Sequence, residues 1–268
     1  MFDESTSVAS LRRYGHDLGG LPELGKFLNH RSVRKYKDEP IPESVIRGLI
    51  ACAQSAATSS NLQLWSVISV QDPGRREQIA TLCGDQKQVR EASWFLGFFA
   101  DHHRLRLAAA AVGEDAGGLD FEEFYGMAVI DASLAAERLV CAAESLGIGI
   151  CYIGAMRNDP FAVKEFLGLP EGVFGVFGLC LGWPEEPLMS EIKPRLTQEA
   201  VWFRERYVTD VSVHIAEYDE RMRAFYEGQN MKGEVTWSMR SGKRVDEHHL
   251  TGREAIRAFL DEQGMALR

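Results

Sequence analysis

The pattern of apolar and polar positions predicts a protein of mixed helices and strands. Three apolar runs, LWSVISV, WFLGFFA and VFGVFGLCLGW, predict buried strands over residues 64–70, 94–100 and 173–183. A shorter run, ICYIGA, predicts a fourth strand over residues 150–155. The tripeptide Asp72-Pro73-Gly74 follows the first strand, and its composition is typical of a turn.

Helical spacing of apolar residues predicts the remaining elements. Val45, Ile46, Leu49 and Ile50 follow a Pro-Glu-Ser start and predict a helix over 42–57. Further helices are expected over 75–84, 158–169, 216–228 and 252–264, and another before His30. The first 20 residues predict a short helix or an ordered arm. Residues 113–118 are small and predict a mobile loop, and the proline-interrupted stretch 184–207 predicts a longer one.

The longest predicted helix, residues 121–145, is rich in alanine and apolar on most sides. A helix of this kind is buried either in a core or at a large subunit interface. No repeat or linker separates the elements. We therefore expect one α+β domain over residues 30–268, preceded by an N-terminal extension and first helix over residues 1–29.

Composition narrows the class of protein. The chain has 268 residues, of which 45% are hydrophobic and 26% charged, as in ordinary globular proteins. It contains no apolar run long enough to span a membrane and no apolar secretion signal at its start, so we expect a cytoplasmic protein. A net charge of −9 disfavours nucleic acid and anionic membranes as partners.

The cysteines and histidines give no sign of a metal site. Five cysteines occur, none with C-x-x-C spacing and most in apolar segments, which favours reduced, buried thiols over disulfides or zinc. His102 and His103 are adjacent and point in different directions, so we expect solvated surface histidines.

Four short clusters could carry chemistry. Residues 30–34, HRSVR, combine two guanidinium groups and a hydroxyl, which suit a phosphate or a solvated basic turn. Residues 58–63 place consecutive polar side chains at a helix exit, where they could line a ligand or simply end the helix. Residues 193–195, KPR, could neutralise an anionic cofactor or lie in a solvated loop. Residues 152–155 place a glycine after a strand, which permits a flat ligand or a tight turn. No nucleophile elbow, Walker loop or G-x-G-x-x-G motif occurs.

Together and in order, these segments resemble the oxygen-insensitive NADPH nitroreductase and flavin reductase branch of the nitroreductase superfamily. The resemblance runs from His30 to the C-terminus and is carried by HRSVRKYKDEPIP, TSSNLQLWSVI, AAESLGIGICYIGAMRN, LPEGVFGVFGLCLGWP and KPRL. It implies an α+β fold with a central, mainly antiparallel sheet wrapped by helices. It also implies an interlocked homodimer with a C-terminal helical excursion and two FMN molecules at the subunit interface.

The resemblance also implies residue roles. The residues that it places at FMN are His30, Arg31, Ser32, Arg34, Ser59, Ser60, Asn61, Gln63, Gln86, Tyr152, Ile153, Gly154, Lys193 and Arg195. Arg34 and Lys193 are implied to offset negative charge on the flavin. Lys232 and Arg253 are implied to bind the phosphate of the nicotinamide cofactor.

Two departures from the family pattern bear on these roles. Ala155 stands where close relatives often have a second glycine. Glu227, Gly228 and Gln229 stand where relatives that prefer NADPH carry an arginine, so the sequence leaves NADPH and NADH both open.

The implied activity is hydride transfer from NAD(P)H through flavin N5 to small electron-poor acceptors: nitroaromatics, quinones or flavins. The implied kinetics are ping-pong, and no side chain is assigned as a nucleophile or acid. Two alternatives remain open. One is a different enzyme on the same fold, such as a flavin reductase that supplies a partner oxygenase, a dehydrogenase or a dehalogenase. The other is a non-catalytic FMN-storage protein.

Overall fold

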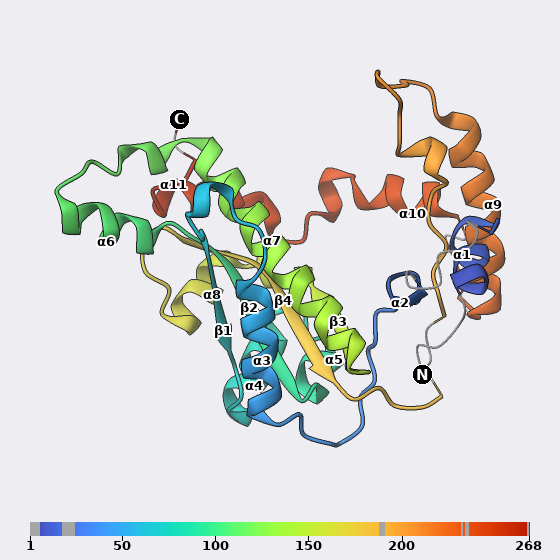
Figure 1. The fold of residues 1–268 in the computed structure, drawn as a ribbon, viewed down its shortest axis with the longest axis horizontal. Helices are drawn as coiled ribbons and strands as arrows, with labels where there is room; N and C mark the ends of the chain where they lie inside the picture. The colour runs from blue at the N-terminus through green and yellow to red at the C-terminus, as the bar shows by residue number, and fades with distance from the viewer. Residues whose placement is uncertain (1–5, 18–24, 188–190, 232, 234–235, 267) are drawn as a thin grey trace. The chain divides into compact units, whose positions relative to one another are not determined.

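The computed structural model describes residues 6–17, 25–187, 191–231, 233, 236–266 and 268 (Figure 1). The chain forms two compact units. The larger unit comprises residues 32–187 and 251–268, and the smaller unit comprises residues 1–31 and 188–250. The sequence-based division at His30 stays a prediction, because compactness alone does not define a domain.

The larger unit is built on one antiparallel sheet. Its strands are β1 (Trp65–Ser69), β2 (Trp94–Asp101), β3 (Gly149–Ile153) and β4 (Val173–Gly182), in the order β1-β2-β4-β3. All four predicted strands are present, and the expectation of a mainly antiparallel sheet is confirmed. β2 and β4 are buried along almost their whole length because they are the central strands, which explains their continuous apolar sequences.

Helices make up most of the remaining structure. The larger unit contains α3 (Glu43–Gln54), α4 (Pro73–Leu82), α5 (Lys87–Glu91), α6 (His103–Val112), α7 (Glu122–Ser145), α8 (Pro160–Leu167) and α11 (Ile256–Glu262). The smaller unit contains α1 (Thr6–Tyr14), α2 (Gly25–Leu28), α9 (Ser212–Gly228) and α10 (Trp237–Arg244). Short 3-10 turns are η2 (Ser59–Asn61), η3 (Gly117–Asp120), η4 (Gly154–Arg157), η5 (Gln198–Ala200), η6 (Glu247–His249) and η7 (Arg253–Ala255).

The alanine-rich helix α7 packs on the sheet and on α3, and Figure 1 shows α3 and α7 side by side. Its inward residues, including Leu139 and Val140, are fully buried with Leu96 and Phe98 of β2. Its other face is open within this chain, where Ile130 is 58% exposed. One face of α7 therefore belongs to the core, and the other presents apolar surface.

The predicted turn at residues 72–74 is wrong, because these residues start α4. The Asp72 side chain accepts a hydrogen bond from the backbone N–H of Arg75 at 2.8 Å, and Pro73 occupies the first helical turn. Aspartate before proline is a strong signal for the start of a helix, because the aspartate side chain accepts a hydrogen bond from an N–H that has no acceptor within the helix. Asp159 caps α8 in the same way, with its side chain accepting the N–H of Ala162 at 2.9 Å.

The segment after β2 departs furthest from expectation. Residues 103–112 form α6, a helix that the sequence pattern did not indicate. His102 is fully buried rather than solvated, and its backbone N–H donates to the carbonyl of Gly172 at 2.8 Å. His103 is half-buried. Gly113 ends α6 in a left-handed conformation, with φ of 74°, and η3 follows; the mobility of residues 113–118 stays a prediction.

The cysteines agree with expectation in part, because two of the five are only half-buried. All five are free thiols; Cys83, Cys151 and Cys180 are buried, and Cys52 and Cys141 are half-buried. No group of three metal-binding side chains occurs among the described residues. Within the same residues, no helix has the length and apolar character needed to cross a membrane.

Candidate functional site

The second half of the HRSVR motif lies along the outer edge of β3. Ser32 forms a parallel bridge with Ile150, and the backbone N–H of Val33 donates to the Ile150 carbonyl at 2.8 Å. Val33 is buried, while the side chain of Arg34 is exposed. The extended backbone thus anchors the motif and turns the Arg34 guanidinium outward, where it is available to a ligand.

The end of β3 brings a glycine and two arginines together. The carbonyl of Gly154 accepts a hydrogen bond from Arg253 Nη2 at 3.2 Å. A Cβ at Gly154 would lie 3.4 Å from Arg157 Nη2 and 3.8 Å from Arg253 Nη2. Arg253 is held further by Asn158, whose Oδ1 accepts from its Nε at 3.0 Å. The structure therefore places Arg253 beside a predicted flavin residue.

Tyr152 and Ile153 are held by the protein itself. The Tyr152 hydroxyl donates to Glu137 Oε2 at 3.1 Å, and its ring meets Phe177 edge-on at 5.0 Å between centroids. Burial, reinforced by the nearby Glu137 carboxylate, raises the pKa of Tyr152, so the phenol stays neutral. Ile153 is buried. Any ligand contact from these two residues would come mainly from their backbone.

Gln86 lies in a turn next to the same segment. Its Nε2 donates to the carbonyl of Cys83 at 2.9 Å, which fixes the side chain against its own turn. A Cβ at Gly84 would lie 3.8 Å from the Ala155 Cβ and 3.7 Å from Asn158 Nδ2. The turn that carries Gln86 and the turn that follows Gly154 are therefore in contact.

The polar segment after α3 has an unusual backbone. Ser60, Asn61 and Gln63 have φ of 49°, 57° and 53°, which is the left-handed region. Residues other than glycine and asparagine rarely adopt this backbone conformation, and a residue held in it lowers the stability of the fold by about 1–2 kcal/mol. All three side chains are exposed. The backbone of this segment therefore lowers the stability of the fold while its side chains face the surface.

A single buried carboxylate holds this segment. Asp131 of α7 is 1% exposed, and it accepts the backbone N–H of Ser59 and of Leu64, both at 3.0 Å. It also accepts the Thr58 hydroxyl, whose oxygen in turn accepts the N–H of Gln63 at 2.9 Å. Sequence analysis missed Asp131. The available signal was a carboxylate within an otherwise apolar, alanine-rich helix.

In the smaller unit, Arg13 joins two of the predicted cationic segments. Its Nε donates to the Leu28 carbonyl at 2.5 Å, and its Nη2 donates to the His30 carbonyl at 2.5 Å. Its Nη1 donates to the Lys193 carbonyl at 3.3 Å, and its own carbonyl accepts the N–H of Arg195 at 2.8 Å. Arg13 is 5% exposed. Sequence analysis gave no role to this residue or to α1.

Helix α9 completes the support of residues 193–195. Arg221 donates to the carbonyls of Arg13 and Arg195, both at 3.1 Å, and the Tyr218 hydroxyl donates to the Pro194 carbonyl at 2.9 Å. The side chains of Lys193 and Arg195 are exposed. The backbone of this predicted cofactor loop is therefore fixed while its cations face outward.

The residues predicted to contact FMN therefore form separate groups, some in the smaller unit and some in the larger. The smaller unit brings His30 near the backbone of Lys193 and Arg195; His30 and Arg31 are half-buried. The larger unit contains the β3 set and the segment held by Asp131. Lys232 lies outside the described residues.

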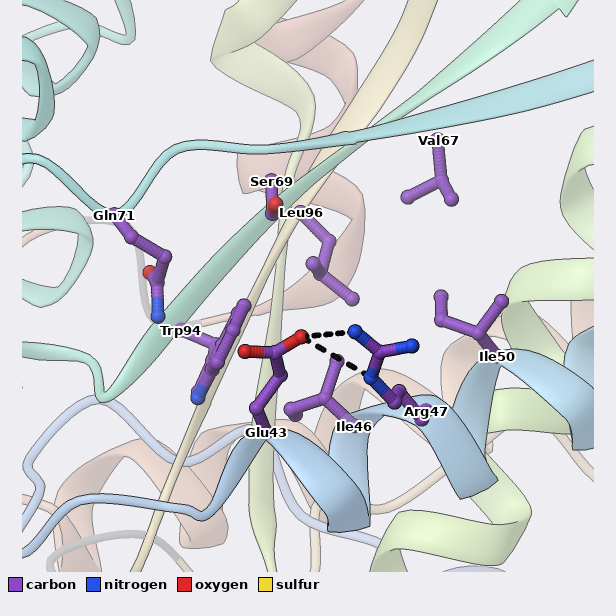
Figure 2. Close-up of a pocket in the computed structure, with 9 residues that line it drawn as sticks. All are labelled: Glu43, Ile46, Arg47, Ile50, Val67, Ser69, Gln71, Trp94 and Leu96. Carbon is purple, nitrogen blue, oxygen red and sulfur yellow. Dashed lines mark hydrogen bonds and ion pairs between the residues drawn. The ribbon is translucent and has the colours of Figure 1, made fainter.

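A cleft of about 550 Å³ lies between α3 and the β1–β2 edge of the sheet (Figure 2). Ile46, Ile50 and Trp94 give it apolar walls, and its charged pair, Glu43 and Arg47, is joined at 2.7 Å. Glu43 neutralises the Arg47 guanidinium, so none of the described residues that line the cleft offers an unpaired positive charge to a phosphate. None of the predicted site residues that the structure describes lines it.

Comparison with known proteins defines the class. A model of the nitroreductase family matches residues 28–183, more than half of the chain, and a model of the family's C-terminal domain matches residues 193–268. The FMN reductase (NADPH) of Bacillus subtilis is 38% identical over 216 residues, covering 79% of this chain and 86% of that protein. The oxygen-insensitive NADPH nitroreductase of Salmonella typhimurium is 35% identical over 250 residues, covering 92% and 99%.

Among solved structures, B. megaterium NfrA1 is similar over 91% of this chain and 98% of its own, with a TM-score of 0.85 and 35% identity. The chain therefore has the α+β fold of that class, and it belongs to the nitroreductase family. The resemblance inferred from the motifs is confirmed. Residues 1–27, which include α1 and Arg13, precede both family matches.

Proposed function

We propose that this chain is an FMN-dependent oxidoreductase that transfers hydride from NADPH or NADH to small electron-poor acceptors. Nitroaromatics, quinones and free flavin are the acceptor classes. The observation that carries the proposal is the family match over both the sheet and the C-terminal helices, with relatives named FMN reductase (NADPH) and oxygen-insensitive NADPH nitroreductase.

The residues at the end of β3 fit FMN. Guanidinium groups are well suited to phosphate, and two of them, from Arg157 and Arg253, flank Gly154. Because Gly154 has no side chain, both guanidinium groups can lie close to its backbone. Gln86, Ser32 and the outward guanidinium of Arg34 add donors in the same unit. We propose that this set contacts FMN and that Arg253 acts there rather than at the nicotinamide phosphate.

FMN, when bound, would supply the redox chemistry that carries hydride from the nicotinamide to the acceptor. The protein's part is to bind the cofactor, to supply positive charge and to admit one substrate after the other. Arg34 and Lys193 are proposed to supply that charge, since positive charge placed in advance stabilises developing negative charge. We assign no side chain as an acid, and we propose ping-pong kinetics.

We further propose that the enzyme is a homodimer. The exposed apolar face of α7, with Ile130 58% and Leu134 44% exposed, is consistent with a subunit interface. The outward side chains of Ser59, Ser60, Asn61 and Gln63 are consistent with contacts beyond this chain. Light scattering tests this directly: a dimer has twice the chain mass of 30.0 kDa, and a monomer contradicts the proposal.

Steady-state kinetics test the activity. Initial rates with NADPH or NADH against a nitroaromatic or a quinone should give parallel double-reciprocal lines. Intersecting lines contradict the ping-pong mechanism, and absence of turnover contradicts the oxidoreductase. Free FMN serves as a second acceptor. A strong preference for it favours a flavin reductase, whereas bound FMN with no oxidation of either nucleotide indicates a storage protein.

A further inference from the structure

Arg104, in the first turn of α6, contacts the far end of the polar segment that Asp131 holds. Its Nη1 donates to the carbonyl of Gln63 at 3.0 Å and to the carbonyl of Trp65 at 3.2 Å. Its Nη2 donates to the Ser66 hydroxyl at 2.9 Å. A single guanidinium in the larger unit therefore joins α6 to the last residue of the predicted FMN segment and to the first two residues of β1.

A buried carboxylate fixes this guanidinium, although the Arg104 side chain itself is 55% exposed. Asp101, the last residue of β2, is buried, and its Oδ2 lies 3.5 Å from Arg104 Nη2. Asp101 Oδ1 accepts the backbone N–H of Arg104 at 3.2 Å, and Oδ2 also accepts the Ser66 hydroxyl. Because a guanidinium carries its donors in a rigid plane, these contacts set the direction in which Arg104 donates.

The peptide group between Gln63 and Leu64 is held by opposite charges at its two ends. Its carbonyl oxygen, from Gln63, accepts from Arg104 at 3.0 Å, and its N–H, from Leu64, donates to Asp131 at 3.0 Å. A peptide group is planar, so contacts at both ends fix the orientation of the whole plane. Gln63 is one of the left-handed residues, with φ of 53°, and this plane sets the other backbone angle of the same residue.

We propose that Arg104 is a positioning residue for FMN, which acts by holding the Gln63–Leu64 peptide group from the end opposite to Asp131. The inference rests on the proposed function, in which Gln63 is one of the residues expected at FMN. Arg104 acts through the backbone of Gln63 and does not itself contact the flavin. Without the guanidinium, Asp131 alone holds this peptide group, so the segment has to be ordered when FMN binds, and that ordering weakens the affinity.

The test compares the FMN affinity of three variants of the full chain, each folded as judged by circular dichroism, with that of the parent protein. Arg104→Ala should raise the Kd for FMN about tenfold or more, because two charge-assisted bonds to carbonyls are lost. Arg104→Lys keeps the charge but not the planar group, and its Kd should lie between these two values. Arg75→Ala is the matched control. It removes an exposed arginine of α4 that donates to the Phe166 carbonyl at 3.0 Å, and it should leave the Kd unchanged.

A second measurement reads the shape of the segment without flavin. Amide hydrogen exchange, followed by mass spectrometry on peptides that cover residues 58–66, should be about tenfold faster in Arg104→Ala than in the parent protein. Exchange in the same peptides should be unchanged in Arg75→Ala. Faster exchange together with a raised Kd is the result expected of a positioning residue.

Three results would overturn the proposal. The first is an Arg104→Ala protein that binds FMN as tightly as the parent protein, whatever its hydrogen exchange. The second is an equal loss of FMN affinity in Arg75→Ala, which would mean an effect of general stability. The third is unchanged exchange over residues 58–66 in Arg104→Ala. A parent protein that binds no FMN contradicts the proposed function itself, and faster exchange in Arg104→Ala would then show that Arg104 shapes the segment without serving a flavin.

Discussion

Asp131 holds the backbone N–H of Ser59 at 3.0 Å, and this contact fastens the polar segment after α3 to the long helix α7. The same buried carboxylate accepts the N–H of Leu64 at the other end of the segment. Between these two points the backbone passes through three left-handed residues. Hydrogen bonds to a carboxylate contribute roughly 1.5–3 kcal/mol each, enough to offset that backbone cost. The segment is thus shaped before any ligand arrives.

Asp131→Asn should therefore weaken FMN binding. One acceptor oxygen becomes an NH₂ group that faces other donors, so the segment loses its fixed shape. We expect FMN affinity to fall about tenfold or more, with a loss of about 1–3 kcal/mol in the free energy of unfolding. Flavin fluorescence during reconstitution of the apoprotein measures the first, and chemical denaturation measures the second.

Asp72→Ala is the matched control for Asp131→Asn. It removes the cap of α4 and should cost about 1 kcal/mol without touching the segment. Equal effects of the two variants on FMN affinity would show that Asp131 acts only through general stability.

Arg13→Ala should loosen the two cationic segments of the smaller unit. Three carbonyls lose a charged donor at a buried position, so the free energy of unfolding should fall by roughly 2–4 kcal/mol. Leu11→Ala, at a position of the same helix that is 55% exposed, should cost less than about 0.5 kcal/mol. Thermal unfolding of both variants, with FMN retention on gel filtration, measures the difference. An Arg13→Ala protein as stable as Leu11→Ala would contradict the role given to α1.

Gly252→Ala should disturb the position of Arg253. Gly252 has φ of 89°, and a Cβ there would lie 2.1 Å from the Asn158 carbonyl oxygen, so backbone must move. Gly168 has φ of 67° but nothing within 4 Å of an added Cβ. Gly168→Ala should cost about 1–2 kcal/mol from backbone strain alone, and Gly252→Ala about 3 kcal/mol or more. Tm values and FMN affinity separate the two; equal losses would contradict the close packing at Asn158.

Acid should destabilise the protein through His102. Burial lowers the pKa of this fully buried imidazole, and a hydrogen bond with the Phe124 backbone opposes that shift. Of the nearby charges, Arg106 lowers the pKa further, and Asp101 and Asp120 raise it. The unfolded chain therefore binds a proton more readily, so stability falls as pH drops below about 6.5, by at most about 1.4 kcal/mol per pH unit. His102→Gln should remove this component. Denaturation at pH 7.5 and pH 5.5 checks it, and an unchanged pH dependence in the variant would exclude His102 as the source.

The sequence predicted the sheet well because burial dominates there. β2 and β4 are covered on both faces, so their apolar runs needed no knowledge of distant partners. α6 was missed since none of its residues is buried, and HRLRLAAAAV has no clear apolar face. The tripeptide at Asp72 suits both a turn and a helix start. His102 is buried by contacts with Gly172, which local sequence does not reveal.

The candidate site likewise contains residues that the sequence indicated and residues that it did not. Local motifs predict exposed cations such as Arg34 and Lys193 as candidate site residues, and both side chains are exposed in the structure. The residues that fix the backbone beneath them were not found, because their partners are remote: Asp131 is 67 positions from Leu64, and Arg13 is 180 positions from Lys193. A single sequence shows which residues are polar, whereas only the fold shows which carbonyls and N–H groups they meet.

The most direct test is an anaerobic visible spectrum of the purified protein, recorded before and after NADPH and NADH are added to parallel samples. We predict a yellow protein that is bleached by at least one of the two nicotinamides, and the faster donor identifies the preferred one. A protein that remains yellow with both donors would contradict the oxidoreductase and leave FMN binding alone. A colourless protein that cannot be reconstituted with FMN would contradict the flavin site itself.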